Sequence, residues 1–260
     1  MPSPRTRGRD GRQHEARVDP LVFRTARGRS GVLSVTGPSA SNPGAVERDP
    51  VKPRLRGVSH EYAFFVSLVA GAALIFAAPS ARAAFAAAVY ALSLSALFGV
   101  SALYHGVTWS VPVRRWMRRL DHSMIFLLIA GTYTPFGLLA LSGTLAVVVL
   151  AVVWSGALAG IALNLIWIDA PKWFSAIVYT SLGWVAVVAL PQLVSHIGST
   201  ATGLLALGGV LYSAGAAAYA LKRPNPVPAV FGYHEVFHAL VIAAAAAQYV
   251  VIAFYVLPRN

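Results

Sequence analysis

Seven apolar segments follow one another along this chain, and they constrain its fold more than any other feature. The segments are Tyr62–Ala78, Ala83–Val107, His122–Leu141, Thr144–Ile168, Trp173–Val194, Ala201–Leu221 and His234–Leu257. A helix of about 20 apolar residues crosses the hydrocarbon core of a bilayer, and each segment is near that length. The sequence therefore predicts an all-α membrane protein, in which residues 57–260 form a bundle of seven transmembrane helices.

The composition supports a membrane protein and excludes several other classes. Of the 260 residues, 57% are hydrophobic and only 12% are charged, whereas an ordinary soluble domain carries about 25% charged residues. Too few polar side chains are present to cover a water-facing surface. The chain also contains no cysteine, which excludes a disulfide scaffold, thiolate metal ligands and a cysteine nucleophile.

Residues 1–56 differ from everything that follows them. Pro, Gly, Ser and Arg dominate this segment, which holds 12 of the 21 Lys and Arg residues of the chain. A segment of this composition cannot bury enough apolar surface to offset the entropy of ordering, so we expect a disordered, Arg-rich cytoplasmic tail. Because the basic charge lies in this tail and not over a folded domain, we expect the lipid bilayer, and no nucleic acid, as partner.

The distribution of Lys and Arg between loops predicts the orientation in the membrane. With the tail inside, the other cytoplasmic loops hold seven Lys and Arg residues, whereas the opposite side holds only Arg82 and Arg259. We therefore expect a multi-pass protein of the cell membrane, with a cytoplasmic N-terminus and an external C-terminus.

Ionisable side chains occur inside the predicted spans, where they are expensive and mark candidate functional sites. His105 ends the second segment, Asp121 precedes the third, and His234 and His238 open the seventh. The second segment runs towards the cytoplasmic side, and the third and seventh start from that side. Connectivity alone therefore predicts that these four residues lie in one layer of the membrane.

The three histidines have the spacing of a zinc site. His234 and His238 are one helical turn apart on one face, and His105 would complete a three-histidine set with an open fourth position. Zinc held in this way activates water for attack on an amide or ester carbonyl. Ser101 precedes His105 by one turn and is a candidate to bond the water or substrate. Asp121 is a candidate proton acceptor, or second partner of a ligand imidazole, although a simple helix cap is an alternative.

Residues 234–238 also match the pattern H-E-x-x-H, in which two histidines bind zinc and the glutamate is a general base. This match raises the alternative of an intramembrane metalloprotease with Glu235 as its essential carboxylate. Against it, no Asp follows His238 in the sequence.

The remaining histidines have simpler interpretations. Single histidines near helix ends are commonly interfacial, and we expect this of His14, His60 and His196. His122 points about 100° around the helix from its neighbour Asp121, so we expect it to pack or form hydrogen bonds and not to bind metal.

Several blocks of the sequence, in the right order, resemble the hemolysin III family, the bacterial branch of the progestin and adipoQ receptor (adiponectin receptor-like) superfamily. The blocks are Ser101-Ala-Leu-Tyr-His105, Leu120-Asp121-His122, Ile129-Ala-Gly-Thr-Tyr-Thr-Pro135 and Phe231-Gly-Tyr-His-Glu-Val-Phe-His238. The resemblance implies seven helices with the N-terminus inside, and one zinc held by three histidines that match His105, His234 and His238. It also implies that Ser101 and Asp121 lie near the metal. Receptor relatives are associated with ceramide hydrolysis.

Three functions are compatible with these observations. The first is a zinc-dependent intramembrane hydrolase of a lipid amide or ester, such as a ceramide-like amide, with Asp121 and Ser101 as catalytic residues. The second is a non-catalytic, zinc-stabilised membrane sensor or pore-forming haemolysin. The third is the intramembrane metalloprotease.

Overall fold

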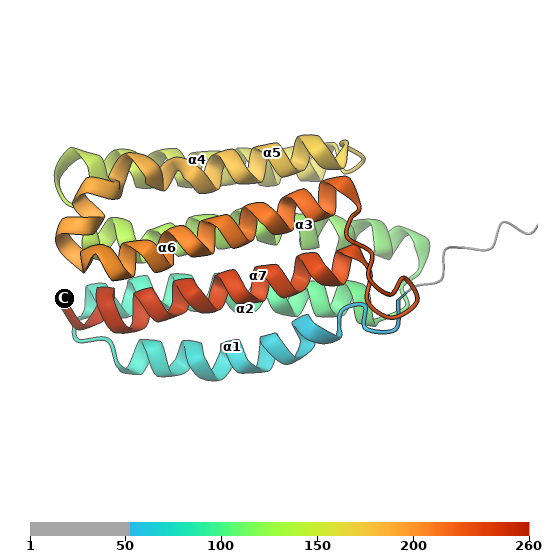
Figure 1. The fold of residues 1–260 in the computed structure, drawn as a ribbon, viewed down its shortest axis with the longest axis horizontal. Helices are drawn as coiled ribbons and strands as arrows, with labels where there is room; N and C mark the ends of the chain where they lie inside the picture. The colour runs from blue at the N-terminus through green and yellow to red at the C-terminus, as the bar shows by residue number, and fades with distance from the viewer. Residues whose placement is uncertain (1–52, 260) are drawn as a thin grey trace, which may run out of the picture. The chain divides into compact units, whose positions relative to one another are not determined.

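The computed structural model describes residues 53–259, and the regular structure of these residues is helical. The main helices (Figure 1) are α1 (Val58–Phe76), α2 (Ala81–Gly106), α3 (Val111–Pro135), α4 (Gly143–Ile166), α5 (Lys172–Gly183), α6 (Leu190–Leu221) and α7 (Tyr233–Val251). The predicted disordered tail falls almost entirely on residues 1–52, which lie outside the described part of the chain.

Six helical stretches within residues 53–259 are long and apolar enough to cross a membrane, so the chain is a multi-pass helical membrane protein. The fifth stretch, Lys172–Leu221, contains 50 residues. As one straight helix it would measure about 75 Å, more than twice the hydrocarbon thickness. Its backbone leaves the helical region at Gly198, with φ 85° and ψ 165°. Figure 1 shows the chain reversing its direction there, between the predicted segments that end at Val194 and begin at Ala201.

The third helix begins at Val111, well before the predicted start at His122. The arginines that were assigned to a loop therefore lie in the first turns of α3. Pro112 favours a helix start there because its φ is already fixed near the helical value. Apolar length alone misses such a start, because arginine forms helices readily while its charged head remains at the membrane surface.

Two arginines of α3 bind backbone carbonyls at the end of the neighbouring helix α4 (Leu165) and just beyond it (Ile168). Arg118 donates to the carbonyl oxygen of Ile168 at 2.6 Å, and Arg119 donates through Nε to that of Leu165 at 3.0 Å. The last carbonyls of a helix have no partner within it, and cationic side chains satisfy them well. These bonds fix α3 against α4.

The bundle closes into a ring because each helix packs on its neighbours in sequence and α1 also contacts α7. Glycine permits the closest approaches. A Cβ at Gly131 of α3 would lie 2.0 Å from Oγ of Ser93 in α2, and one at Gly160 of α4 would lie 2.3 Å from the ring of Phe126 in α3. Small residues serve this purpose in membrane bundles.

Two prolines, Pro135 and Pro191, coincide with changes in helix type. Pro135 ends α3 and leads into a π-helical turn at Phe136–Ala140, and Pro191 lies in the first turn of α6 after a 3-10 segment at Trp184–Ala189. Proline removes a backbone donor and crowds the preceding turn, so a regular helix does not continue through it.

The two ends of the bundle differ in charge. The start of α1 and the α2–α3, α4–α5 and α6–α7 connections lie together at the right in Figure 1. We call this the basic end, and its Lys and Arg residues among those described are Arg54, Arg56, Arg114, Arg115, Arg118, Arg119, Lys172, Lys222 and Arg223. We call the opposite end, which carries Arg82 and Arg259, the far end.

Candidate metal centre

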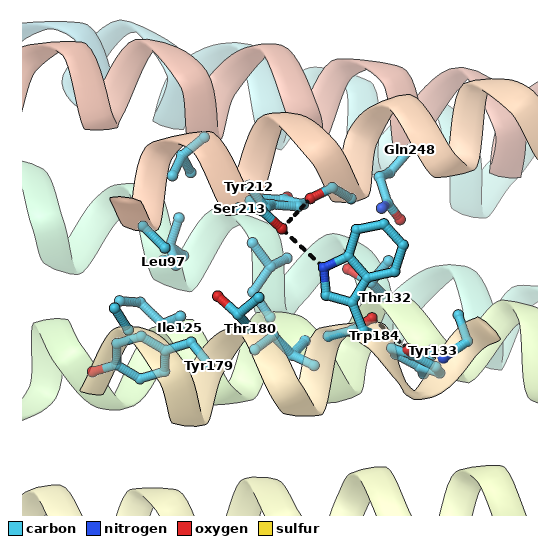
Figure 2. Close-up of a pocket in the computed structure, with 18 of the residues that line it drawn as sticks. Leu97, Ile125, Thr132, Tyr133, Tyr179, Thr180, Trp184, Tyr212, Ser213 and Gln248 are labelled. Carbon is cyan, nitrogen blue, oxygen red and sulfur yellow. Dashed lines mark hydrogen bonds between the residues drawn. The ribbon is translucent and has the colours of Figure 1, made fainter. Parts of the chain in front are cut away.

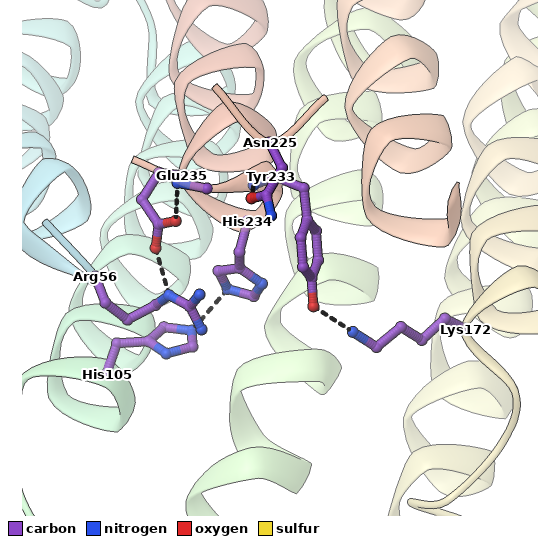
Figure 3. Close-up of polar contacts among 8 residues, drawn as sticks. Arg56, His105, Lys172, Asn225, Tyr233, His234 and Glu235 are labelled. Carbon is purple, nitrogen blue, oxygen red and sulfur yellow. Dashed lines mark hydrogen bonds and ion pairs between the residues drawn. The ribbon is translucent and has the colours of Figure 1, made fainter. Parts of the chain in front are cut away.

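Three histidines from two helices converge at the basic end. His105 lies in the last turn of α2, and His234 and His238 lie in the first two turns of α7. One ring nitrogen from each lies within 4.8 Å of the others, and all three residues are buried. The Nε2 atoms of His105 and His234 are 3.0 Å apart, and Figure 3 shows these two rings facing each other. The predicted proximity of the three residues is confirmed.

The nitrogen set fits a small divalent cation. Two nitrogen ligands of a tetrahedral zinc ion lie about 3.3 Å apart, since each Zn–N bond is about 2.0–2.1 Å. Nδ1 of His238 is buried and has no hydrogen-bond partner among the described residues. Buried ring nitrogens are normally paired, so the unpaired Nδ1 of His238 is consistent with a metal ion bound in the cluster. The metal-binding role of the three histidines remains a prediction.

His60 was expected at the membrane interface, and this expectation is wrong. The residue is 2% exposed, and its ring stacks on that of His238, with 3.7 Å between centroids and 9° between planes. The ring also lies within hydrogen-bonding reach of the backbone of His238. The connectivity argument that brought the other histidines together applies equally to α1, which starts at the basic end, and would have found His60.

Glu235 holds the beginning of α7, and with it two of the clustered histidines. One carboxylate oxygen, Oε2, accepts a hydrogen bond of 2.8 Å from the backbone N–H of Gly232, and the other forms an ion pair with Arg56. The side chain is 2% exposed. Figure 3 shows this arrangement beside His234. Both oxygens are therefore engaged in fixing the helix start.

The segment before α1 is fitted closely to the cluster. Gly57 has φ 89°, a conformation that side chains disfavour, and a Cβ there would lie 2.7 Å from Cβ of His105. Just before it, the backbone N–H groups of Arg54 and Leu55 donate to the α6–α7 connection, at Ala229 and Val230. Residues 53–56, which were assigned to the tail, thus contact the bundle.

Asp121 and Ser101, the predicted catalytic pair, lie in one cavity with the cluster. Asp121 is ten residues inside α3, which begins at Val111, so the alternative of a helix cap is wrong. Its side chain is within hydrogen-bonding reach of Ser101. Both residues line the cavity that His234 and His238 also line. This places a carboxylate and a hydroxyl beside the histidines.

The cavity itself is about 210 Å³ in volume and lies between α2, α3, α5, α6 and α7. It extends from the histidines and Lys172 at the basic end to Leu141 and Leu190 towards the far end, and most of its lining is apolar or aromatic. A space of this shape and lining suits a hydrocarbon chain.

Lys172 is the one Lys or Arg among the described residues that line this cavity. Its ammonium group donates to the hydroxyl of Tyr233 at 3.1 Å and lies 4.4 Å from the ring centroid of Tyr219. Figure 3 shows the contact with Tyr233. The two aromatic side chains stabilise the cation through a hydrogen bond and a cation–π contact.

Fold and site together define a polytopic helical membrane protein with a buried histidine cluster at one end. Comparison with known proteins identifies the family. A family model described as Haemolysin-III related matches residues 49–249, and the chain belongs to this family.

Individual relatives agree with this assignment. The chain is 35% identical over 167 residues to the Hemolysin-3 homolog of Bacillus subtilis (strain 168), covering 64% of this chain and 75% of the relative. It is 35% identical over 179 residues to Hemolysin-3 of Bacillus cereus, covering 69% and 78%. A human relative, Monocyte to macrophage differentiation factor, is 28% identical over 167 residues, covering 62% and 66%. The last match supports the expected link to a wider superfamily.

Proposed function

We propose that His105, His234 and His238 bind one zinc ion. The supporting observation is the burial of three ring nitrogens within 4.8 Å of one another. Imidazole nitrogens are preferred zinc ligands, and three of them leave a fourth position open for chemistry. The stacked ring of His60 and the anchored start of α7 would hold the ligands in place.

We further propose that the protein is an intramembrane hydrolase of a lipid amide or ester, such as a ceramide-like amide. The observation that carries this proposal is an apolar cavity that reaches the cluster and includes Ser101 and Asp121 in its lining. Bound zinc supplies a Lewis acid for the carbonyl and lowers the pKa of water. Asp121 accepts a proton from the attacking water and returns it to the leaving group. Ser101 donates a hydrogen bond to the carbonyl oxygen, and the apolar lining holds the chain and excludes bulk water.

The proposed topology has seven crossings of the cell membrane, with the N-terminus in the cytoplasm and the C-terminus outside. The reversal at Gly198 supports a division of Lys172–Leu221 into two crossings. The basic end supports the orientation, because Lys and Arg are retained on the cytoplasmic side. The catalytic centre would then lie near the cytoplasmic surface.

The second candidate function is a zinc-stabilised sensor or pore-forming haemolysin without catalysis. The names of the Bacillus relatives, Hemolysin-3 among them, favour it. In that case zinc would only tie α2 to α7. The intramembrane protease receives less support, because both oxygens of Glu235 are engaged by Arg56 and Gly232, whereas a general base needs access to water.

The first experiment is elemental analysis of purified protein, for the wild type and for His238→Ala. We expect about one zinc per chain in the wild type and little zinc in the variant. Loss of one of three ligands should weaken binding by more than the about 10–100-fold that loss of an orienting group costs. Absence of zinc above background in unchelated wild-type protein would refute the metal site.

The second experiment measures hydrolysis of a ceramide-like amide and of a matched ester by the zinc-loaded protein. Asp121→Asn is expected to retain zinc and to lose about 10²–10⁴-fold in rate, the usual contribution of a general base. Ser101→Ala is expected to lose less. Full zinc occupancy with no turnover of either lipid would favour the sensor or haemolysin.

A further inference from the structure

A second polar group lies deep in the apolar cavity, away from the histidine cluster. Gln248 of α7 lines the cavity and is only 7% exposed. Its Oε1 atom is buried and has no hydrogen-bond partner among residues 53–259. Figure 2 shows the amide among the residues that line this part of the cavity. Buried side-chain oxygens are nearly always paired, so this exception requires an explanation.

The neighbouring helix leaves room for the amide. Gly208 of α6 faces Gln248, and a Cβ at that glycine would lie 3.1 Å from both Cγ and Nε2 of the glutamine. A larger residue at position 208 would displace the amide. The packing of α6 on α7 therefore accommodates a polar side chain where an apolar one would fill the same space without any unpaired atom.

Nearby hydroxyl groups do not satisfy Oε1. Ser213 lines the same region, but it accepts from Nε1 of Trp184 at 2.9 Å and donates its own hydrogen to the carbonyl of Gly209 at 2.8 Å. Figure 2 shows the bond between Ser213 and Trp184. Its single donor is used, so the oxygen of Gln248 remains available to a donor that enters through the cavity.

The position of Gln248 relative to the cluster sets the size of such a ligand. Ten residues separate it from His238 on the same helix, a distance of about 15 Å along the axis. An extended hydrocarbon chain covers this distance with roughly twelve carbon–carbon bonds of ~1.5 Å in a zigzag. A lipid chain with its head at the histidines would pass the glutamine near the middle of its length.

We propose that Gln248 binds a hydroxyl group carried part-way along the hydrocarbon chain of a lipid whose head lies at the histidine cluster. This proposal rests on the proposed function for the position of the head group. A hydroxyl donates to Oε1 and also accepts from the amide N–H, so one neutral group satisfies both atoms. A plain hydrocarbon chain leaves Oε1 unpaired, and a charged group would be far costlier to bury.

The test compares fatty acids, which are products of the proposed hydrolysis, by titration calorimetry with the zinc-loaded full chain in detergent. The probes are stearate, 12-hydroxystearate and 6-hydroxystearate. We expect 12-hydroxystearate to bind roughly fivefold more tightly than stearate, the contribution of one net hydrogen bond. The isomer with its hydroxyl at the sixth carbon should bind no more tightly than stearate. Equal affinities of all three probes for the wild type would overturn the proposal.

Two variants test whether Gln248 causes the preference for 12-hydroxystearate. Gln248→Met keeps an unbranched side chain of similar length and should abolish the preference, with stearate binding unchanged or tighter. Gln192→Met, at the far end, should keep the preference. Unfolding temperature and zinc content show whether each variant is folded. If a variant does not fold, the comparison of the three probes on the wild type still tests the proposal. A preference that persists in Gln248→Met would overturn the proposal.

The outcomes separate this site from the proposed function. Equal binding of the probes together with zinc-dependent turnover would overturn the hydroxyl site alone. A preference lost in Gln248→Met, without turnover of any lipid, would support the site and overturn the hydrolase. Binding of no fatty acid would overturn the hydroxyl site, while the turnover experiment decides the hydrolase separately.

Discussion

The basic end and the far end of the bundle use buried polar side chains differently. Towards the far end, several of these side chains join neighbouring helices: Tyr249 of α7 donates to the carbonyl of Ala70 in α1 at 3.0 Å, and Trp154 of α4 donates to Oγ1 of Thr134 in α3 at 3.2 Å. Gln248 and His196 are exceptions, each with one buried atom that is unpaired within residues 53–259. At the basic end, Nδ1 of His238, in the middle of the histidine cluster, has no hydrogen-bond partner among the described residues.

The difference indicates where a ligand acts. In a bilayer, hydrogen bonds between helices contribute about 0.6 kcal/mol on average, and their purpose at the far end is to hold neighbouring helices together. The unpaired nitrogen of His238 contributes nothing of this kind, so its retention in the cluster requires another reason. The proposed metal supplies that reason, and three substitutions test the contrast.

The largest effect is expected for Glu235→Ala at the basic end. The substitution leaves the guanidinium of Arg56 and the N–H of Gly232 without their partner, and removing one member of a buried pair costs about 3 kcal/mol or more. We expect a lower free energy of unfolding in detergent and a lower zinc content, because the start of α7 carries two of the clustered histidines.

Glu235→Gln is the matched control. It keeps an acceptor for Gly232 and removes only the charge, so it should be less destabilising than the alanine variant. Turnover should follow zinc content in both variants. Loss of turnover in Glu235→Gln at unchanged stability and zinc content would instead favour Glu235 as a general base.

The second effect is expected towards the far end, for Gly131→Ala. The new methyl group would lie against Ser93, with 2.0 Å to its Oγ, so α2 and α3 must separate. Overpacking of this kind costs about 2 kcal/mol. Unfolding measurements should detect this loss while zinc content stays unchanged. Gly203→Ala, which meets no atom within 4 Å, should cause no such loss, and a fall in zinc content in Gly131→Ala would break the division between the two ends.

The smallest of the three effects is expected for Gly57→Ala. A side chain at this positive φ is strained and would lie 2.7 Å from Cβ of His105. Displacement of a ligand side chain should weaken zinc binding about tenfold, as loss of an orienting contact does, and competition with a chelator would measure it. Gly106→Ala, with no atom within 4 Å, should bind zinc normally. Equal affinities in the two variants would show that the position of His105 does not depend on Gly57.

The sequence predicted those features that depend on helix length and direction. Apolar runs located the membrane helices, and alternating direction brought His105 to His234 and His238. It missed the start of α3, because apolar length does not detect helix that emerges into the charged interface. It also missed the pairing of Arg56 with Glu235, since 179 positions separate these residues and no local pattern links them.

The cavity was equally invisible in the sequence. An apolar helix face is the same pattern whether neighbouring helices close against it or leave a space. Gln248 stood in an alanine-rich run with no sign that its oxygen lacks a partner. Such features depend on how several helices pack at once, which a single sequence does not encode locally.

The contact between the segment before α1 and the α6–α7 connection has a practical consequence for shortening the chain. A truncated form that begins at or before Pro53 keeps the backbone bonds of Arg54 and Leu55 and the ion pair of Arg56. A form that begins at Gly57 would bury the carboxylate of Glu235 without its cation. Fusion partners and purification tags therefore belong upstream of residue 53, and the start of the chain should be chosen by this ion pair and not by where the first apolar run begins.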